Sequence, residues 1–364
     1  LGNTLTGLIV IKYNHETGLS KRTAIVVPKS VLENLFYESD LFFGETNLSS
    51  MAFVGIDPQF NTDGTLKREP VLDDEGNHKL DKNNQPITRP KLKIDTSGKK
   101  VGPKLHSLAQ DSSVKIVVMT MDTYKAIPMK PESIADNVDQ MVGAGLMANS
   151  GKFVAEAKKY REKQKNDKFK ATHADDGTNK NETMPYFEDL LFDSVLVDEG
   201  HNYRNSYKTG SYGNRLAFMP NGAQADQALD MQMKNNLIKR RNNGKGVYML
   251  SATPTVNSPI DAFNMLSHIV PPETFAQMGI VDSDDFIRLF GRTEETNVHK
   301  LSGDVETKEA LVGFQNLDAL RNLFHRFVTI KDMKDVNAEV HIPDLETQTN
   351  YVEMNEEQRE IYEE

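Results

Sequence analysis

Two acids and a histidine follow an apolar run near the middle of the chain, in the order Asp198-Glu199-Gly200-His201. A carboxylate at the end of a buried parallel strand is placed to hold a magnesium ion, and a second carboxylate beside it can orient water against a terminal phosphate. These residue types therefore indicate phosphoryl transfer to water. We expect Asp198 to hold the metal, Glu199 to polarise the attacking water and His201 to sense the phosphate.

A second apolar run, residues 247–250, ends in Ser251-Ala252-Thr253-Pro254. Strands that end in aspartate are common, so residues 195–198 alone predict only a strand. The hydroxyl-bearing turn strengthens the interpretation, because the carboxyl ends of parallel strands meet at one edge of a sheet. We therefore expect Ser251, Ala252 and Thr253 to lie beside the two acids and to couple phosphate sensing to movement.

The two motifs resemble the second and third motifs of the superfamily-two helicases, Asp-Glu-x-His and Ser-Ala-Thr. Residues 23–34, a strand followed by Val-Pro-x-Ser and a helical pattern, resemble the next block of the Swi/Snf-like branch, and residues 115–124 resemble the block after it. Residues 323–332 and 351–359 resemble the segment that leaves the first motor lobe in that branch. Within the branch, the chain looks closest to helicase-like proteins of phages and plasmids, some of which carry a DNA methylase region.

The resemblance implies a RecA-like (P-loop NTPase) lobe that binds ATP and Mg²⁺, contacts DNA, most often duplex, and works with a second RecA-like lobe in the same parent chain. Lys29, Thr120 and Tyr124 occupy blocks that meet the DNA backbone in the family, a contact that reads no sequence. The alternative is that Tyr124 is a packed aromatic residue and Lys29 a solvated cation. Gly200 stands where many members have alanine, and we expect the small residue to let the backbone pass close to bound phosphate.

The amino-terminal residues depart from the family pattern. Residues 1–7 align with the end of a Gly-x-x-x-x-Gly-Lys-Thr phosphate loop if Asn3 stands in place of the lysine. Gly2, Asn3 and Thr4 would then bind the nucleotide, and the Thr4 hydroxyl would join Asp198 at magnesium. Asn3 cannot supply the positive charge of lysine, so we expect impaired hydrolysis. The other interpretation is a misplaced alignment, because the first strand and the first half of the loop are absent from the sequence.

Apolar strand-like runs alternate with helical patterns, which predicts a three-layer α/β fold whose mainly parallel sheet is covered on both faces. The expected strands are residues 24–27, 52–56, 115–120, 194–197 and 247–250. Two insertions interrupt this unit. Residues 57–104 are rich in turn formers and are expected to form turns, short hairpins or a mobile loop with poor order, and residues 131–183 a helical hairpin with a flexible tip. We assign residues 1–330 to the lobe and residues 331–364 to a linker toward a missing second lobe.

Composition restricts the class of protein. With 364 residues, 38% of them hydrophobic, and no cysteine, the chain can bury a sizeable core but cannot form disulfides, which is compatible with the reducing cytoplasm of a bacterial host. No apolar stretch approaches the ~18 residues that cross a bilayer, so no membrane partner is expected. The net charge of −10 argues against a surface devoted to nucleic acid. DNA contact is still possible at local patches such as the basic stretches 152–170 and 231–245, although most charge runs are solvated faces.

Three functions remain open. The first is the ATP-binding lobe of a DNA-dependent ATPase that unwinds DNA or translocates along it, and the isolated chain should then show negligible turnover because the second lobe supplies an arginine. The second is a nucleotide or DNA clamp that keeps the fold without hydrolysis. The third is a restriction or anti-restriction component of a phage or plasmid in which this lobe feeds a methylase, although the sequence contains no Asn-Pro-Pro-Tyr-type methylase motif.

Overall fold

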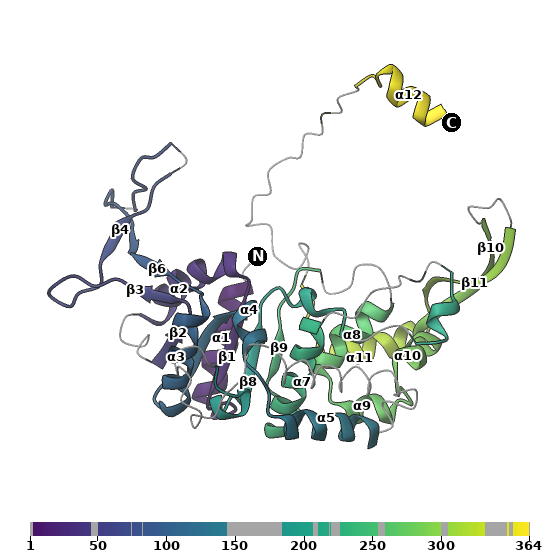
Figure 1. Cartoon of the computed structure of the whole chain (residues 1–364), viewed down its shortest axis with the longest axis horizontal. Coiled ribbons are helices and arrows are strands. Elements are labelled where there is room, and N and C mark those ends of the chain that lie inside the picture. The colour runs from purple at the N-terminus through teal and green to yellow at the C-terminus, as the bar shows by residue number, and fades with distance from the viewer. Residues whose placement is uncertain are drawn as a thin grey trace. The chain divides into compact units, whose positions relative to one another are not determined.

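A computed structural model of the chain (Figure 1) describes residues 3–44, 50–73, 75–81, 83–143, 184–206, 210–217, 219, 226–253, 259–299, 305–331, 348 and 352–363. The chain divides into two compact units, Leu1–Arg321 and Asn322–Glu364. The second unit includes α12 (Glu356–Glu363), and α11 (Leu317–Phe327) crosses the boundary. The central sheet and both motifs belong to the first unit.

Five parallel strands form the central sheet in the order β2-β7-β1-β8-β9. They are β2 (Met51–Phe53), β7 (Ile116–Thr120), β1 (Thr23–Val27), β8 (Ser194–Val197) and β9 (Val247–Met249). The predicted α/β fold with a parallel central sheet is therefore confirmed. The expected strand at residues 52–56 is shorter, because Gly55 adopts a φ of 90° and the chain leaves the sheet there.

Helices cover both faces of this sheet. One face carries α1 (Asn3–Glu16) and α2 (Lys29–Phe43), and the other carries α3 (Gly98–Gln110), α4 (Met121–Ala126), α5 (Pro131–Gly143) and α7 (Asp226–Arg241). In β1, Ile25 and Val27 pack with α1 and α2, whereas Ala24 and Val26 pack with the second layer. A strand buried on both faces is mostly apolar, as β1 is from Ala24 to Val27. The three layers are compatible with a RecA-like lobe.

Residues 56–94 form a module outside the central sheet (Figure 1). In it β3 (Ile56–Pro58) pairs with β6 (Leu92–Ile94), and β4 (Arg68–Pro70) pairs with β5 (Thr88–Pro90). Three short hairpins share one arrangement, each closed by an antiparallel bridge: Phe60 with Leu66, Leu72 with His78, and Leu80 with Pro86. The short hairpins predicted for the first insertion are confirmed, but its last residues, from Gly98 on, already belong to a helix, and the expected poor order stays a prediction.

The hairpin turns are stabilised by their own side chains, and the module is attached to α2. Asp73 Oδ1 accepts hydrogen bonds from the N–H groups of Glu75 and Asn77, at 3.0 and 2.8 Å, and Asp81 does the same in the next turn. At the base of the module, the guanidinium of Arg89 lies 5.1 Å from the ring centroid of Tyr37 in α2. The module is therefore fixed to the lobe by side-chain contacts as well as by its two ends.

The second insertion begins as expected with a helix, α5. Residues 144–183, which include the basic stretch 152–170 and the predicted flexible tip, lie outside the described residues. The chain resumes in a short 3₁₀ helix, η2 (Phe187–Leu190), before β8.

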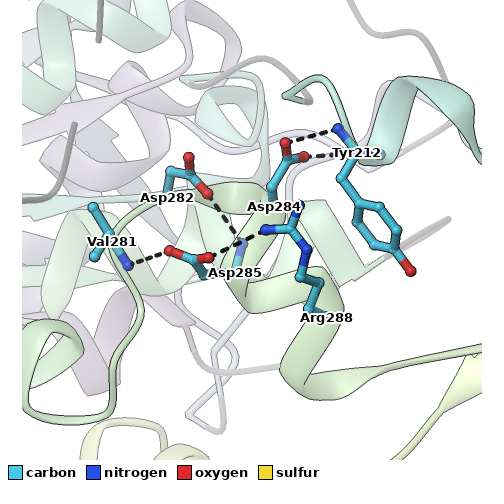
Figure 2. A network of polar contacts seen from close by, with 7 residues as sticks. Tyr212, Val281, Asp282, Asp284, Asp285 and Arg288 are labelled. Atoms are coloured by element: carbon cyan, nitrogen blue, oxygen red, sulfur yellow. Dashed lines mark hydrogen bonds and ion pairs between the residues drawn. The ribbon is translucent and has the colours of Figure 1, made fainter. Parts of the chain in front are cut away.

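After β9 the chain forms α8 (Pro259–Ile269), α9 (Pro272–Gln277) and α10 (Ser283–Phe290), then a ribbon of β10 (Gly291–His299) and β11 (Val305–Phe314). The amino-terminal end of α10 contacts residues 210–213, which follow the Asp-Glu-x-His motif in the sequence (Figure 2). Asp284 accepts hydrogen bonds from the N–H groups of Tyr212, at 2.9 Å, and Gly213, at 3.0 Å. The guanidinium of Arg288 lies 4.6 Å from the Tyr212 ring centroid. This cluster fixes the path of residues 210–213.

Candidate functional site

The candidate site lies at the carboxyl edge of the sheet, where β1 and β8 are neighbours. After β1, the chain adds β2 and β7 on one side and then β8 and β9 on the other, so the winding direction reverses between β1 and β8. Ligands of open α/β sheets bind at the carboxyl ends of strands at such a reversal. Lys29 follows β1 at this edge, and Asp198 follows β8, with its N–H donating to Val26 O at 2.9 Å.

A sharp turn at the end of β8 presents the acids. Glu199 has a left-handed backbone with φ 50° and ψ 46°, which is uncommon for a residue other than glycine, and it leads into the 3₁₀ turn η3 (Gly200–Tyr203). The N–H of Gly200 donates to Leu250 O at 2.8 Å. A Cβ at position 200 would lie 3.1 Å from Cβ of Met249. The small residue therefore lets the turn approach β9, and the expected approach to phosphate stays a prediction.

His201 connects the two motifs. Its Nδ1 lies 3.1 Å from Ser251 Oγ and 3.1 Å from Glu199 Oε2. Ser251 Oγ also accepts a hydrogen bond from the N–H of Thr253, at 3.1 Å. The predicted convergence of the two motifs at neighbouring strand ends is thus confirmed. Ala252 and Thr253 are exposed beside Ser251, and the coupling role of these three residues stays a prediction.

The side chain of Asp198 is buried at the carboxyl edge of the sheet. The residue is 8% exposed, and burial raises the pKa of its carboxyl, whereas the hydrogen bond from the N–H of Glu199, at 3.0 Å, lowers it. A carboxylate in such a place is stabilised by a nearby cation. Thr4, in the first turn of α1, lines the same hollow as Asp198, and apolar side chains of α1, β1 and β8 form most of its remaining wall. Thr4 and Asp198 therefore line one hollow, and their role as magnesium ligands stays a prediction.

The first turn of α1 contains Asn3 and Thr4, whereas Gly2 lies outside the described residues. N–H groups in the first turn of a helix lack partners within the helix and favour anions. Among the described residues, no three His, Asp or Glu side chains are grouped to hold a metal. The donors at hand, a carboxylate and a hydroxyl, suit Mg²⁺, which keeps water and phosphate oxygens in its shell. Asp198 and Thr4 are therefore candidate ligands for Mg²⁺, and binding of a nucleotide at this edge stays a prediction.

The three residues predicted to contact DNA are placed differently. Lys29 is exposed at the first position of α2, but Thr120 and Tyr124 are only 2% and 1% exposed. Thr120 Oγ1 accepts a hydrogen bond from the N–H of Thr123, at 3.1 Å, and so caps α4. Tyr124 packs edge to face against Phe187, with ring centroids 5.6 Å apart. The packed interpretation of Tyr124 is therefore correct, and the expected DNA contact is not available to Thr120 or Tyr124 in this structure.

Two lysines of the basic stretch 231–245 are also placed differently from expectation, whereas Arg241 and Lys245 are exposed. The stretch falls mainly in α7, where Lys234 is 0% and Lys239 3% exposed. Lys234 Nζ donates to Asp230 Oδ2 at 2.7 Å and to Tyr124 O at 2.6 Å. Lys239 Nζ donates to Ser267 O at 2.9 Å, and burial lowers the pKa of Lys239 to about 7. These two lysines belong to the core and cannot meet DNA phosphates.

The sequence interpretation missed the role of α7 as a buried polar helix. Asp230 and Lys234 are four residues apart, a spacing that places oppositely charged side chains on one helix face. That spacing was the available signal, but it does not distinguish a buried pair from a solvated one.

A separate finding concerns membranes: none of the described helices is long and apolar enough to span one.

Comparison with curated proteins shows one clear similarity. The chain is 42% identical over 364 residues to the Defense against restriction protein B of Escherichia phage P1. The chain is therefore homologous to part of a phage anti-restriction protein. The match covers 100% of this chain but only 16% of the relative's length. No protein-family model matches the chain, and no solved structure matches it.

Proposed function

We propose that the chain is the ATP-binding lobe of a DNA-dependent ATPase, a superfamily-two helicase or duplex translocase of the Swi/Snf-like branch, within a phage protein that acts against restriction. The observation that carries the proposal is the contact of His201 Nδ1 with Ser251 Oγ at 3.1 Å. It joins an Asp-Glu-x-His turn to a Ser-Ala-Thr turn at the carboxyl edge of a parallel sheet. The name of the homologous phage protein supports the anti-restriction setting.

The side chains divide the chemistry among them. Asp198 and Thr4 supply oxygen ligands for Mg²⁺, which neutralises phosphate charge when it is bound. Glu199, with its side chain 38% exposed, faces solvent and is placed to orient and deprotonate the attacking water. His201 contacts both Glu199 and Ser251. A displacement of the Glu199 side chain on phosphate binding would therefore be transmitted through His201 to residues 251–253. The arginine that completes hydrolysis comes from a second lobe in this proposal.

DNA is the proposed second ligand, held through its backbone. Lys29 carries this part of the proposal, because it is exposed and follows β1 at the same sheet edge as Asp198. Thr120 caps α4 and Tyr124 packs in the core, so neither residue contacts DNA in this proposal.

A second candidate function is a nucleotide or DNA clamp without hydrolysis. The observation in its favour is Asn3, the first residue of α1, at the position aligned with the phosphate-loop lysine. An amide carries no positive charge and cannot form an ion pair with phosphate, and losing such a charged contact costs about 1.5–3 kcal/mol. Binding would then persist while transition-state stabilisation is lost.

Binding of a fluorescent ATP analogue to the purified chain tests the proposal. We expect binding that requires Mg²⁺ and is lost with a chelator, and Asn3→Lys should tighten it about tenfold if Asn3 stands at the lysine position. Asp198→Asn should remove the Mg²⁺ dependence, whereas Glu353→Gln, at an exposed site, should change nothing. The absence of binding by both the natural chain and Asn3→Lys would refute the proposal.

Phosphate release separates the two candidate functions. The parent protein with both lobes should hydrolyse ATP faster when DNA is added, and Glu199→Gln should abolish that stimulation. Equal rates in the natural protein and Glu199→Gln would favour the clamp. The isolated chain should show negligible turnover in either case, and robust DNA-stimulated turnover by the chain alone would contradict the role given to the second lobe.

A further inference from the structure

A fully buried histidine, His268 in α8, links α7 to the turn that follows the acids. Its Nδ1 lies 3.1 Å from Asn235 Nδ2, and its Nε2 lies 3.0 Å from Tyr203 O. An amide NH₂ group only donates and a carbonyl oxygen only accepts, so the imidazole accepts at Nδ1 and donates at Nε2. This arrangement requires the neutral ring, and burial agrees with it by lowering the pKa of His268 to about 4.

The carbonyl groups held by α8 belong to the candidate site. Tyr203 is the last residue of η3, the turn that follows Glu199 and contains His201. Asn264, one helical turn before His268, donates from Nδ2 to Arg204 O at 2.6 Å. Two consecutive carbonyl groups at the end of the turn are therefore bound by side chains of one helix.

The helix that holds the turn is itself fixed by α7. Lys239 Nζ donates to Ser267 O at 2.9 Å and to Val270 O at 3.1 Å, which satisfies carbonyl groups at the carboxyl end of α8. Gln232 Nε2 donates to Ser267 O at 2.9 Å. These donors are buried with the groups they bind, so removing the Lys239 ammonium would take away hydrogen bonds at the end of α8 that buried carbonyl groups need.

We propose that His268 is a positioning residue for the nucleotide site: it fixes the turn of Glu199 and His201 to α8, the helix that follows Ser251–Thr253. Because α8 also packs against β9, the strand that precedes Ser251, one helix supports both turns and the contact between His201 and Ser251 at 3.1 Å. Hydrogen bonds weaken steeply when their geometry departs from the optimum, so a small displacement of the turn would break this contact. The role assigned to the turn rests on the proposed function, whereas the anchoring of its backbone does not.

Hydrogen–deuterium exchange of the whole chain tests the anchoring without any need for activity. The informative amides are those of Gly200, Asn202 and Arg204, which donate to Leu250 O, Glu199 O and His201 O. In His268→Leu the ring is replaced by an apolar group that cannot donate to Tyr203 O, and exchange in the peptide covering residues 199–206 should rise about tenfold. His268→Gln keeps an N–H donor at the position of Nε2 and should restore slow exchange. Peptides of β1 and β7 should be unchanged in both variants.

Two further variants keep the test decisive. Asn264→Ala removes the neighbouring bond to Arg204 O and should accelerate exchange in the same peptide, even if His268→Leu is too unstable to interpret. His325→Leu, at an exposed histidine, should have no effect there. Equal exchange in His268→Leu and the natural chain, or equal acceleration in the Leu and Gln variants, would overturn the proposal. Failure of the natural chain to bind nucleotide would refute the proposed function but leave the exchange result intact.

Discussion

Lys234 and Asp230 form an ion pair of 2.7 Å in which the two side chains are 0% and 2% exposed. Lys234 Nζ also donates to Tyr124 O at 2.6 Å and lies 4.8 Å from the Tyr124 ring centroid. One ammonium group thus joins α7 to α4, the helix that begins after Thr120. Burial lowers the pKa of Lys234, and the charge of Asp230 opposes that shift.

Removing this ammonium group should destabilise the lobe strongly. Lys234→Met keeps most of the side-chain volume but leaves the buried Asp230 carboxylate without the cation it contacts, and such a loss costs about 3–5 kcal/mol. Urea unfolding followed by circular dichroism measures the change. The double variant Asp230→Leu/Lys234→Met should recover much of the stability, and Lys245→Met, at an exposed lysine, is the matched control. A Lys234→Met variant as stable as this control would show that the pair contributes little.

His268 should make stability depend on pH in a defined window. Its pKa is about 4 in the folded chain against 6.5 in the unfolded chain, so between these values the unfolded state binds a proton that the folded state does not. Stability should therefore fall as pH decreases from 6.5 towards 4, by roughly 3 kcal/mol in total from this residue. Urea unfolding at several pH values should show a shallower loss for His268→Gln. Parallel curves for the two proteins would argue against the neutral buried ring.

Asp198 should control the pH dependence of Mg²⁺-dependent nucleotide binding. Burial raises the pKa of its carboxyl, and Mg²⁺ binds the deprotonated form. As pH falls, binding should therefore weaken at a higher pH than expected for an ordinary aspartate. Titrating a fluorescent ATP analogue across pH, with Asp198→Asn in parallel, checks this. The variant should bind weakly and without that pH step, and a step retained by Asp198→Asn would assign it to another group.

Gly210 should tolerate no side chain. A Cβ at this position would lie 2.2 Å from Asp284 Oδ2, the atom that accepts the hydrogen bond from the N–H of Tyr212. Gly210→Ala must therefore displace the contact between the segment and α10 shown in Figure 2, at a cost of about 1–3 kcal/mol. The control is Gly98→Ala, because nothing lies within 4 Å of a Cβ at position 98. Equal unfolding midpoints in urea for the two variants would contradict the tight fit.

The sequence predicted the features that depend on regular patterns. The apolar runs at 194–197 and 247–250 predict buried strands, and the structure has β8 and β9 there. The neighbouring places of Asp198 and Ser251 follow from the ends of those strands, whereas their chemistry stays a prediction. Patterns of charge were less informative. The charge pattern predicts Lys234 and Lys239 as surface residues, because the sequence does not show that they bind Asp230 and the carbonyl groups of α8 in the core. Tyr124 shows the same limit, because an aromatic residue after a strand suits either a surface or a core.

The module of residues 56–94 leaves the lobe and returns to it through adjacent backbone positions, since the N–H of Asp95 donates to Gly55 O at 3.0 Å. The distance between these two attachment points therefore does not depend on the length of the module. Adding or removing a hairpin within the module should leave the register of β2 against β7 unchanged. Natural variation in length should therefore concentrate in this module.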